Sequence, residues 1–338
     1  MDTILYSLNA VLPILLLVGL GYFLKRVHFL DADFLTHANR FVFRIALPTL
    51  LFVTIYQIDQ LNDINWPMVL FAVGGILFLF VLGLLFAFVF IKDPKQKGVL
   101  VQGVFRSNYA IIGIPLAQAI GGFEAVANVA LVSAIAVPLM NILSVVSLTM
   151  FVEDHQTPGT FRKTLVKVIT NPLIIAVFLG LAALWIRSWI PIDSTTGLPV
   201  FTIEHQIPFL YLAITWVGQI ASPLALIVLG GTFEFFVIKD LKRQIILGVL
   251  ARNLMAPALT LTLAVLMTKW IESVTLGPDQ YPALIALFAS PTAVASAIMA
   301  AEMDNDKRLA VQLVVWTTTL SVVTIFFTVF VFRSLSLI

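Results

Sequence analysis

Charged residues are few for a chain of this length, and their scarcity excludes an ordinary soluble domain. Only 11% of the 338 residues are Asp, Glu, Lys or Arg, whereas 60% are hydrophobic. Soluble domains usually carry about a quarter charged residues. Phe alone occurs 27 times, and apolar runs reach the length needed to span a bilayer. The sequence therefore predicts an all-α polytopic membrane protein whose surroundings are the lipid bilayer.

Cysteine is absent, and the residues that carry most enzymatic and metal chemistry are scattered. Without Cys the chain has no disulfide framework, thiolate metal site or Cys nucleophile. The four His residues lie in loops and near span ends, with no Gly-rich phosphate loop or positioned acid–base pair beside them. We therefore predict no catalytic residues, no metal site, no cofactor and no enzymatic activity. A net charge of +2 is too small to indicate a nucleic-acid partner.

Apolar stretches of spanning length recur along the whole chain and set the expected architecture. The loops between them differ in charge: thirteen Lys and Arg fall in the odd-numbered loops, against two in the even-numbered loops and one after the last span. By the positive-inside rule, the odd-numbered loops are cytoplasmic and both termini are extracytoplasmic. The ten predicted transmembrane helices lie near 4–24, 38–56, 66–91, 98–120, 125–151, 166–189, 208–234, 244–268, 281–301 and 309–332.

Similar short segments recur at nearly the same distance along the chain. Leu-Ser-Val-Val occurs at 143–146 and again at 320–323, which is 177 residues later. Ile-Ala-Leu-Pro at 45–48 resembles Ile-Ala-Ser-Pro at 220–223, which is 175 residues later. Chance similarity is the alternative, because apolar helices draw on few residue types. With five helices in each half, the second half enters the membrane from the opposite side, so the pattern predicts two inverted five-helix repeats.

This repeat predicts the domain organisation and indicates a class of function. The first five-helix repeat is expected at 1–152, a cytoplasmic link at 153–165, and the second, inverted repeat at 166–338. Inverted repeats are typical of secondary transporters, which bind their substrate near the bilayer midplane between the two halves.

The fourth and ninth predicted spans each contain a proline among small and polar residues. Pro115 and Pro291 are 176 residues apart, which continues the repeat. Because proline removes a backbone donor and clashes with the preceding turn, each helix is expected to open just before it, and a second half-helix to begin at it. The positive N-terminal ends would then meet near the midplane and attract a carboxylate. Ordinary proline kinks are the alternative. Further hydrogen bonds to the anion are expected from Asn108, Ser290, Thr292 and Ser296.

Four arginines, Arg40, Arg44, Arg106 and Arg252, lie inside predicted spans, with no carboxylate at comparable depth. A charge at this depth is costly and indicates function by default. The excess of cations predicts an anionic substrate, or an anionic lipid at the inner leaflet. Snorkelling is the alternative, because all four lie in the cytoplasmic half of their spans. Since no Asp or Glu lies in mid-membrane, the sequence does not indicate proton or sodium coupling.

Several segments resemble motifs of the auxin efflux carrier family, which includes bacterial malate and malonate permeases and the plant PIN proteins. Arg-Ser-Asn-Tyr at 106–109, followed by Gly-Ile-Pro-Leu at 113–116, is similar to the fourth-span motif of that family. Pro-Leu-Ala at 223–225, Leu-Gly at 229–230 and Ser-Pro-Thr-Ala at 290–293 are similar to its second-half motifs. The resemblance covers essentially the whole chain.

The resemblance implies a sodium/proton-antiporter-like fold of ten helices, in which broken helices 4 and 9 cross. Helices 1, 2, 6 and 7 would form a scaffold, with a homodimer through the scaffold as one implication. Helices 3–5 and 8–10 would form a transport core that moves like an elevator. The third span, near 66–91, lacks the acidic residue that plant members carry there, so proton coupling is not carried over.

We therefore expect a secondary transporter of small organic anions, mono- or dicarboxylates such as malate or malonate, in a bacterial inner membrane. Two alternatives stay open: a sodium-coupled organic-anion symporter of the same fold, and a receptor that binds a carboxylate without moving it. The residues expected to bind the substrate are Asn108, Tyr109, Pro115, Ser290, Pro291 and Thr292, with Arg44, Arg106 and Arg252 as the cationic side chains.

Overall fold

The computed structural model is helical and describes residues 2–57, 66–152, 166, 169–191, 200–234, 237–270 and 276–338. A helix lies within each of the ten predicted spanning ranges. Within the described residues, six helices are long and apolar enough to cross a membrane. Ten crossings and their inverted arrangement stay predictions, and the predicted link at 153–165 lies outside the described residues.

The elements are α1 (Asp2–Arg26), α2 (Ala32–Phe41), the π-helix η1 (Val42–Ala46), α3 (Leu47–Tyr56), α4 (Trp66–Phe90), α5 (Pro94–Phe105), α6 (Tyr109–Thr149), α8 (Pro172–Ser188), α9 (Ile203–Gln206), α10 (Pro208–Gly231), α11 (Val237–Leu250), the π-helix η2 (Ala251–Met255), α12 (Ala256–Trp270), α13 (Tyr281–Ala289), α14 (Ala295–Glu302) and α15 (Lys307–Ser334).

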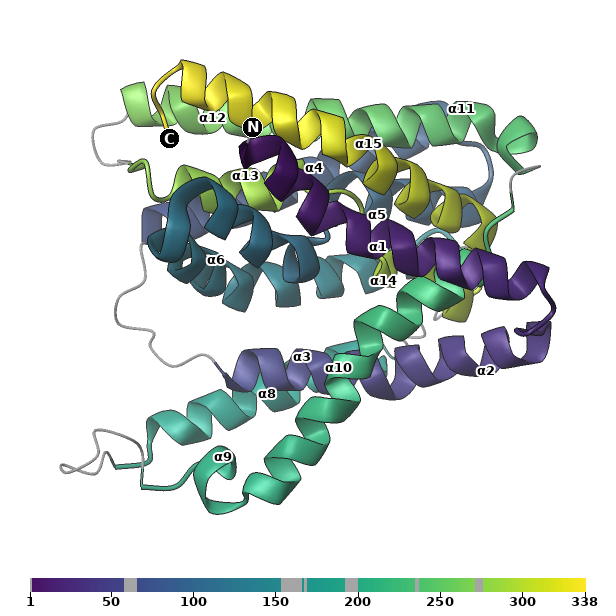
Figure 1. Ribbon diagram of the computed structural model, residues 1–338, viewed down its shortest axis with the longest axis horizontal. Helices are drawn as coiled ribbons and strands as arrows, with labels where there is room; N and C mark the ends of the chain where they lie inside the picture. Colours follow the sequence, from purple (N-terminus) through teal and green to yellow (C-terminus); the bar gives the residue numbers. More distant parts are fainter. Residues whose placement is uncertain are drawn as a thin grey trace.

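The helices form two groups, which Figure 1 shows as an upper body and a lower limb. The limb consists of α2, η1, α3, α8, α9 and α10, in which α3 packs against both α8 and α10. The body consists of α4 to α6 and α11 to α15. Helix α1 packs along α10 and also contacts α6 and α15 of the body.

Helices α1 and α10 cross so closely that glycine is required at two positions. A Cβ atom at Gly21 would overlap the backbone of Ile227, and one at Gly230 would overlap the backbone of Val18. Small residues at such positions let two membrane helices meet backbone to backbone. We therefore count α1 with the limb.

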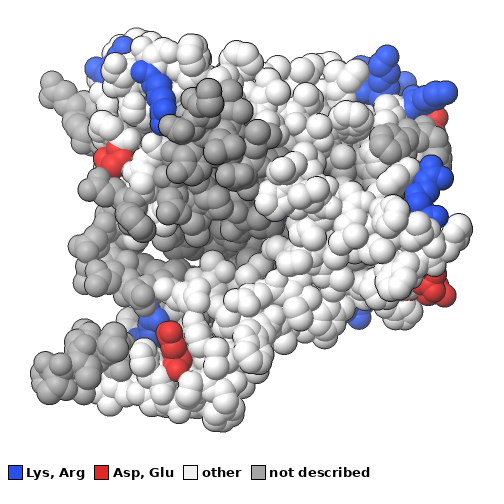
Figure 2. All heavy atoms as spheres, in the orientation of Figure 1, with Lys and Arg blue, Asp and Glu red and all other residues white. Residues whose placement is uncertain are grey.

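Lys and Arg gather at one end of the molecule, which we call the basic end. Its loops are the α1–α2, α4–α5, α10–α11 and α14–α15 connections, and Figure 2 shows a group of basic side chains there, at the right. Four helices begin at this end with a polar N-cap whose side chain accepts a backbone N–H, at Asp31, Asp93, Asn171 and Asp306. These caps satisfy donors that a helix start otherwise leaves free. The positive-inside rule predicts that this end is cytoplasmic.

The fourth and ninth spans are both interrupted, and their extended segments pair with each other. Helix α5 ends before Arg106, and α13 ends before Ser290. Ser107 and Thr292 form an antiparallel bridge. Beside it, the Asn108 N–H donates to the Pro291 carbonyl at 2.8 Å. Each broken helix thereby supplies partners for backbone groups of the other, as a non-helical backbone at membrane depth requires.

The interruption of the ninth span follows the expectation from Pro291, but that of the fourth span does not follow Pro115. Ser290 is extended, with φ −63° and ψ 148°, as the residue before a proline prefers. In the fourth span the helix opens at Arg106 and resumes at Tyr109, so Pro115 lies within α6. The half-helices begin at Tyr109 and Ala295 rather than at the two prolines. The fourth-span break is therefore set by pairing with the ninth.

A glycine separates the predicted fourth and fifth spans. Gly122 has φ 70° and ψ −154°, a conformation that residues with a Cβ atom rarely adopt. The continuous element α6 therefore contains two helices of different direction. The first of these two helices follows the interruption of the fourth span, and the second lies beside the crossing of the interrupted fourth and ninth spans.

Candidate functional site

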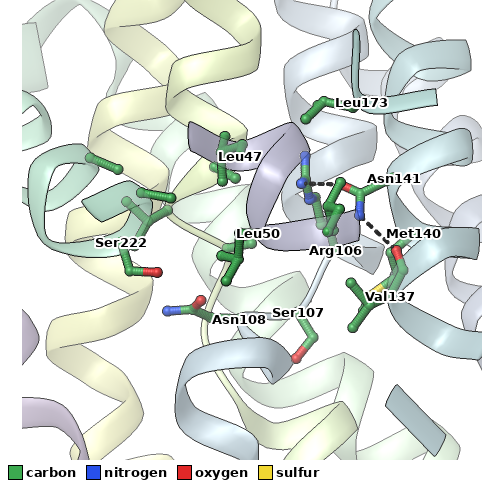
Figure 3. Close-up of a pocket in the computed structure, with 16 residues that line it drawn as sticks. Leu47, Leu50, Arg106, Ser107, Asn108, Val137, Met140, Asn141, Leu173 and Ser222 are labelled. Carbon is green, nitrogen blue, oxygen red and sulfur yellow. Dashed lines mark hydrogen bonds between the residues drawn. The ribbon is translucent and has the colours of Figure 1, made fainter. Parts of the chain in front are cut away.

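The crossing of the interrupted helices borders a cavity of about 70 Å³ between the body and the limb. Figure 3 shows its wall. The body contributes the extended segment after α5, one face of the second part of α6 and the start of α14. The limb contributes α3, α10 and the start of α8. The lining residues are Leu47, Leu50, Leu51, Arg106, Ser107, Asn108, Val137, Met140, Asn141, Leu173, Ala221, Ser222, Ala225, Ala293, Val294 and Ala295.

Two polar side chains of the fourth-span interruption reach the cavity without a partner in the described part of the protein. Asn108 is 3% exposed, and its Nδ2 donates no hydrogen bond. The Ser107 hydroxyl, also buried, has no hydrogen-bond partner there. A buried polar group left unpaired costs about 1–3 kcal/mol, so native structures rarely keep one without a use. This pair is suited to a ligand that accepts hydrogen bonds.

The N-terminal ends of two half-helices adjoin the same cavity. Helix α6 starts beside Asn108 and α14 starts at Ala295, and both of these residues line the wall. Neither N-cap residue, Asn108 or Val294, makes a side-chain capping bond, in contrast to the four caps at the basic end. At the start of α14 the Ser296 and Ala297 N–H groups donate to the Ala293 and Val294 carbonyls, but the starts of both helices carry a partial positive charge. Both therefore favour an anion in the cavity.

Arg106 is the one charged side chain among the lining residues, and its named partners are neutral. It is 5% exposed. Its Nη2 donates to Asn141 Oδ1 at 2.6 Å, and its Nη1 to the sulfur of Met299. The Asn141 amide is itself oriented by donating to the Val137 carbonyl at 2.8 Å. A cation held by an amide and a thioether keeps its charge available to an anionic ligand.

Arg252, on the π-helix η2, lies at the same crossing but not in the cavity wall. It is fully buried, and its donors are taken by backbone carbonyls. The accepting carbonyls belong to Val104 and Phe105 at the end of α5, and to Leu287 and Ser290 at the end of α13. The last carbonyls of a helix are unpaired and carry partial negative charge. One guanidinium thus caps both half-helices that lead into the crossing.

Ser290, Pro291 and Thr292, expected at the site from the ninth span, are engaged within the protein and do not line the cavity. Ser296, also expected there, lies outside the wall as well, and its buried hydroxyl has no hydrogen-bond partner among the described residues. The Ser290 hydroxyl donates to the Ala286 carbonyl at 2.6 Å, and the Thr292 hydroxyl to the Gly103 carbonyl at 3.0 Å. The Pro291 carbonyl accepts from the Asn108 N–H. In this conformation Ser290, Pro291 and Thr292 hold the crossing together, and small apolar residues that follow them form the wall.

Two other expected residues, Tyr109 and Arg44, also lie outside the cavity wall. Tyr109 is fully buried and packs against Gly113 on its own helix. Arg44 is exposed on η1. The side chain of Pro115, within α6, lies outside the described part of the protein. Of the expected side chains that the structure describes, it brings Arg106 and Asn108 to the cavity.

Sequence reasoning missed Asn141, Ser222 and the leucines of the limb. Asn141 is an isolated amide in a strongly apolar helix, which is a detectable signal. Ser222 lies in the repeated tetrapeptide at 220–223, where the other copy has Leu47. The structure places both members of this repeat pair in the wall of one cavity. Figure 3 shows Asn108 and Ser222 on one side, with Arg106 and Asn141 on the other.

Polar contacts also join body and limb at the basic end. Asn39 on α2 donates to Glu302 Oε1 on α14 at 2.8 Å. Gln312 on α15 donates to the Glu234 carbonyl, which follows α10, at 2.7 Å. A second cavity, of about 330 Å³, lies there between η1 and the ends of α6 and α14, with Glu302 in its wall. These contacts hold the two groups together on the side predicted to be cytoplasmic.

Comparison with known proteins gives two matches that cover nearly the whole chain. The profile of a family described as "Membrane transport protein" matches residues 6–329. A protein of Methanothermobacter thermautotrophicus described as "Uncharacterized transporter" is 26% identical over 322 residues, which cover 94% of this chain and 96% of the relative.

Proposed function

The chain belongs to the membrane transport protein family, also known as the auxin efflux carriers, and on this premise we propose that it is a secondary transporter of a small organic anion. Mono- and dicarboxylates, malate and malonate among them, are the proposed substrate class. The family consists of transporters rather than enzymes, and the apolar helices are those of a multi-pass membrane protein. The proposed location is a bacterial inner membrane, with both termini extracytoplasmic.

The observation that carries the proposal is the chemistry of the cavity at the crossing. Its charged side chain is Arg106, held by neutral partners, and its buried free amide donor is Asn108 Nδ2. Two uncapped helix starts add positive potential. A carboxylate accepts hydrogen bonds from guanidinium and amide donors such as these and compensates a buried positive charge. A cation would meet positive potential and hydrogen-bond donors there, whereas it needs negative charge and acceptor oxygens.

The size of the cavity supports a movement between body and limb. A volume of about 70 Å³ is less than half of the roughly 150 Å³ of a cavity that binds benzene, so it is less than an organic acid needs. The lining comes from both groups, so separating them enlarges the site. We identify the limb and α1 with the scaffold, and the body with the transport core. Elevator-like displacement of the body would then carry the crossing from one side of the membrane to the other.

The contacts at the basic end support the same division. The Asn39–Glu302 hydrogen bond joins a limb helix to a body helix. Displacement of the body breaks this bond and exposes the second cavity, so the basic end would be closed in the present conformation. The inverted repeat supplies the second, oppositely closed conformation. A homodimer through the scaffold helices completes the proposed assembly.

Counterflow in proteoliposomes tests this function. Vesicles are preloaded with malate, malonate, succinate, lactate or an aromatic acid, and uptake of the labelled acid is followed with and without proton or sodium gradients. Accumulation of at least one anion, weakened in Asn108→Ala, is the expected result. Binding of an anion without flux would favour a receptor. Dependence on a sodium gradient would favour the sodium-coupled symporter, and absence of both binding and flux would contradict an anion site.

A further inference from the structure

A shallow groove lies on the surface of the body at the basic end, away from the central cavity. It has a volume of about 650 Å³ and is formed by α11 and the last residue of α4. Figure 2 shows basic side chains at the upper right, where Figure 1 places the start of α11. We call this surface the α11 groove. Its lining includes Phe90, Lys239, Lys242, Arg243, Ile246 and Leu250.

Helix α11 turns opposite faces toward the body and toward the groove. The buried face includes Val237, Leu241 and Ile245, and the helix packs against α5 and α15 of the body. The residues of the other face are exposed and recur at spacings of three and four, so they form one stripe along the helix. The members of this stripe are Lys239, Lys242, Arg243, Ile246 and Leu250.

The stripe is cationic at its start and apolar after Arg243. Ile246 and Leu250 follow Arg243 by three and seven residues, which is about 5 and 10 Å along the helix axis. They are 47% and 46% exposed. The span predicted here begins near residue 244, so the cations lie at the level of the lipid headgroups and the two apolar side chains at the level of the acyl chains.

The three cations of the stripe have no carboxylate partner among the described residues, unlike other basic side chains at this end. Lys95 pairs with Asp304 at 3.0 Å, and Arg308 pairs with Asp240 at 3.6 Å. Because Asp240 also lines the groove, the second pair compensates a carboxylate that would otherwise oppose an anion there. The groove therefore carries a positive charge that the described part of the protein does not balance.

Phe90, at the end of α4, borders the groove opposite the stripe. The guanidinium of Arg243 lies over its ring, 6.0 Å from the ring centroid. A ring in this position holds the guanidinium without neutralising its charge. The groove thus combines cations held at the membrane surface with an apolar surface directly below them.

We propose that the α11 groove binds an anionic phospholipid of the cytoplasmic leaflet. The phosphate lies against Lys239, Lys242 and Arg243, and one acyl chain lies along Ile246 and Leu250. Basic pockets at the cytoplasmic ends of membrane helices suit anionic headgroups, and each cation near the surface favours them by about fivefold. A soluble phosphate would use the cations but not the apolar half of the stripe. The site is separate from the site of the transported substrate.

Lipid binding to the full-length protein, purified and delipidated in detergent, tests the proposal. Native mass spectrometry compares the adducts formed with phosphatidylglycerol and with phosphatidylethanolamine, whose headgroups differ in net charge. Phosphatidylglycerol is expected to bind at least about tenfold more tightly. Equal binding of the two lipids overturns the proposal. Glycerol phosphate, added as a soluble competitor at the same concentration, is expected to displace little lipid, and full displacement would show a phosphate site instead.

Charge-removing variants locate the binding on α11. Lys242→Gln combined with Arg243→Gln is expected to lower the affinity for phosphatidylglycerol at least about tenfold. Arg26→Gln combined with Arg40→Gln removes as many charges from exposed positions of α1 and α2 and should keep the wild-type affinity. Thermal unfolding checks that both variants fold. An equal loss in the two variants would show that net charge attracts the lipid and that the groove does not.

A fluorophore at the apolar end of the stripe tests the site without removing any cation. Because the chain contains no cysteine, Ile246→Cys can be labelled alone in nanodiscs whose lipids carry brominated, quenching acyl chains. Brominated phosphatidylglycerol is expected to quench the label more than brominated phosphatidylcholine at equal content. Leu263→Cys, at a 43% exposed position of α12 about 25 Å further along the helices, is the control and should show no preference.

Equal quenching by the two lipids at Ile246→Cys overturns the site even if phosphatidylglycerol binds elsewhere on the protein. None of these measurements follows transport, so their outcome does not depend on the proposed function.

Discussion

Arg106 and Arg252 lie at the same crossing, are both buried, and are held in opposite ways. Arg252 donates to four backbone carbonyls from the ends of two half-helices. Arg106 donates to a side-chain amide and a thioether and borders the cavity. Depth in the membrane is therefore a poor guide to role. The hydrogen-bond partners of each guanidinium distinguish a charge that stabilises the fold from one that is available to a ligand.

The two extended segments show the same contrast. In the ninth-span segment, the Ser290 and Thr292 hydroxyls both donate to carbonyls of the protein. In the fourth-span segment, the Ser107 hydroxyl and Asn108 Nδ2 have no partner in the described residues. Although the segments pair through their backbones, one is built as a support and the other as a binding surface.

The largest effect is expected from Arg252→Gln. The substitution removes the charge and leaves several buried carbonyls without a donor, at about 1–3 kcal/mol each, so a loss of about 3–5 kcal/mol of folding free energy follows. Thermal unfolding in detergent, followed by fluorescence, measures it. Arg333→Gln, the same change at an exposed position of α15, is the matched control and should be neutral. If Arg252→Gln folds like the wild type and loses only transport, the comparison of the two arginines fails.

Arg106→Gln is expected to show the reverse pattern. The carboxylate of the substrate loses a charged partner worth about 1.5–3 kcal/mol, so counterflow should fall roughly 10- to 100-fold while the unfolding temperature changes little. Arg106→Lys keeps the charge but loses the fork of donors, and should recover part of the flux. Unfolding of Arg106→Gln comparable to that of Arg252→Gln would show that both arginines serve the fold.

A smaller and sharper contrast is expected between Asn108→Ala and Thr292→Val. Loss of the Asn108 amide should weaken substrate affinity about 3- to 10-fold, the equivalent of one hydrogen bond of about 0.5–1.5 kcal/mol, with stability unchanged. Thr292→Val should lower stability by about the same free energy, because the Gly103 carbonyl loses its donor. Isothermal titration with a transported acid and thermal unfolding separate the two. Equal effects on affinity would place both residues at the substrate.

The location of the ninth-span break was predictable from sequence, whereas that of the fourth was not. Pro291 imposes an extended conformation on Ser290 by local sterics alone. The sequence predicted a helix break at Pro115, but α6 continues through this residue. The fourth span instead opens at Arg106 because its backbone pairs with the ninth-span segment. Such pairing depends on residues far away in the chain, which a local rule does not see.

The residues of the candidate site likewise divide into those that the sequence indicated and those that only tertiary contacts reveal. Asn108 and Arg106 were predicted as polar residues in a motif-bearing span, and both reach the cavity. The role of Arg252 could not be inferred, because its carbonyl partners come from α5 and α13. Ser222 and Leu50 enter the wall only because the limb packs against the crossing. Sequence therefore indicated which residues were unusual, and tertiary contacts decided which of them face a ligand.

Protection of single cysteines tests the central claim most directly, because the natural chain contains no cysteine. Ser107 and Thr292 face each other in the bridge, but only the first of them lines the cavity. A small thiol reagent is applied to Ser107→Cys and to Thr292→Cys, with and without an anion that the protein transports. The account predicts that the anion slows labelling of Ser107→Cys and leaves that of Thr292→Cys unchanged. Equal protection of both cysteines, or none at Ser107→Cys in a protein that still transports, would contradict it.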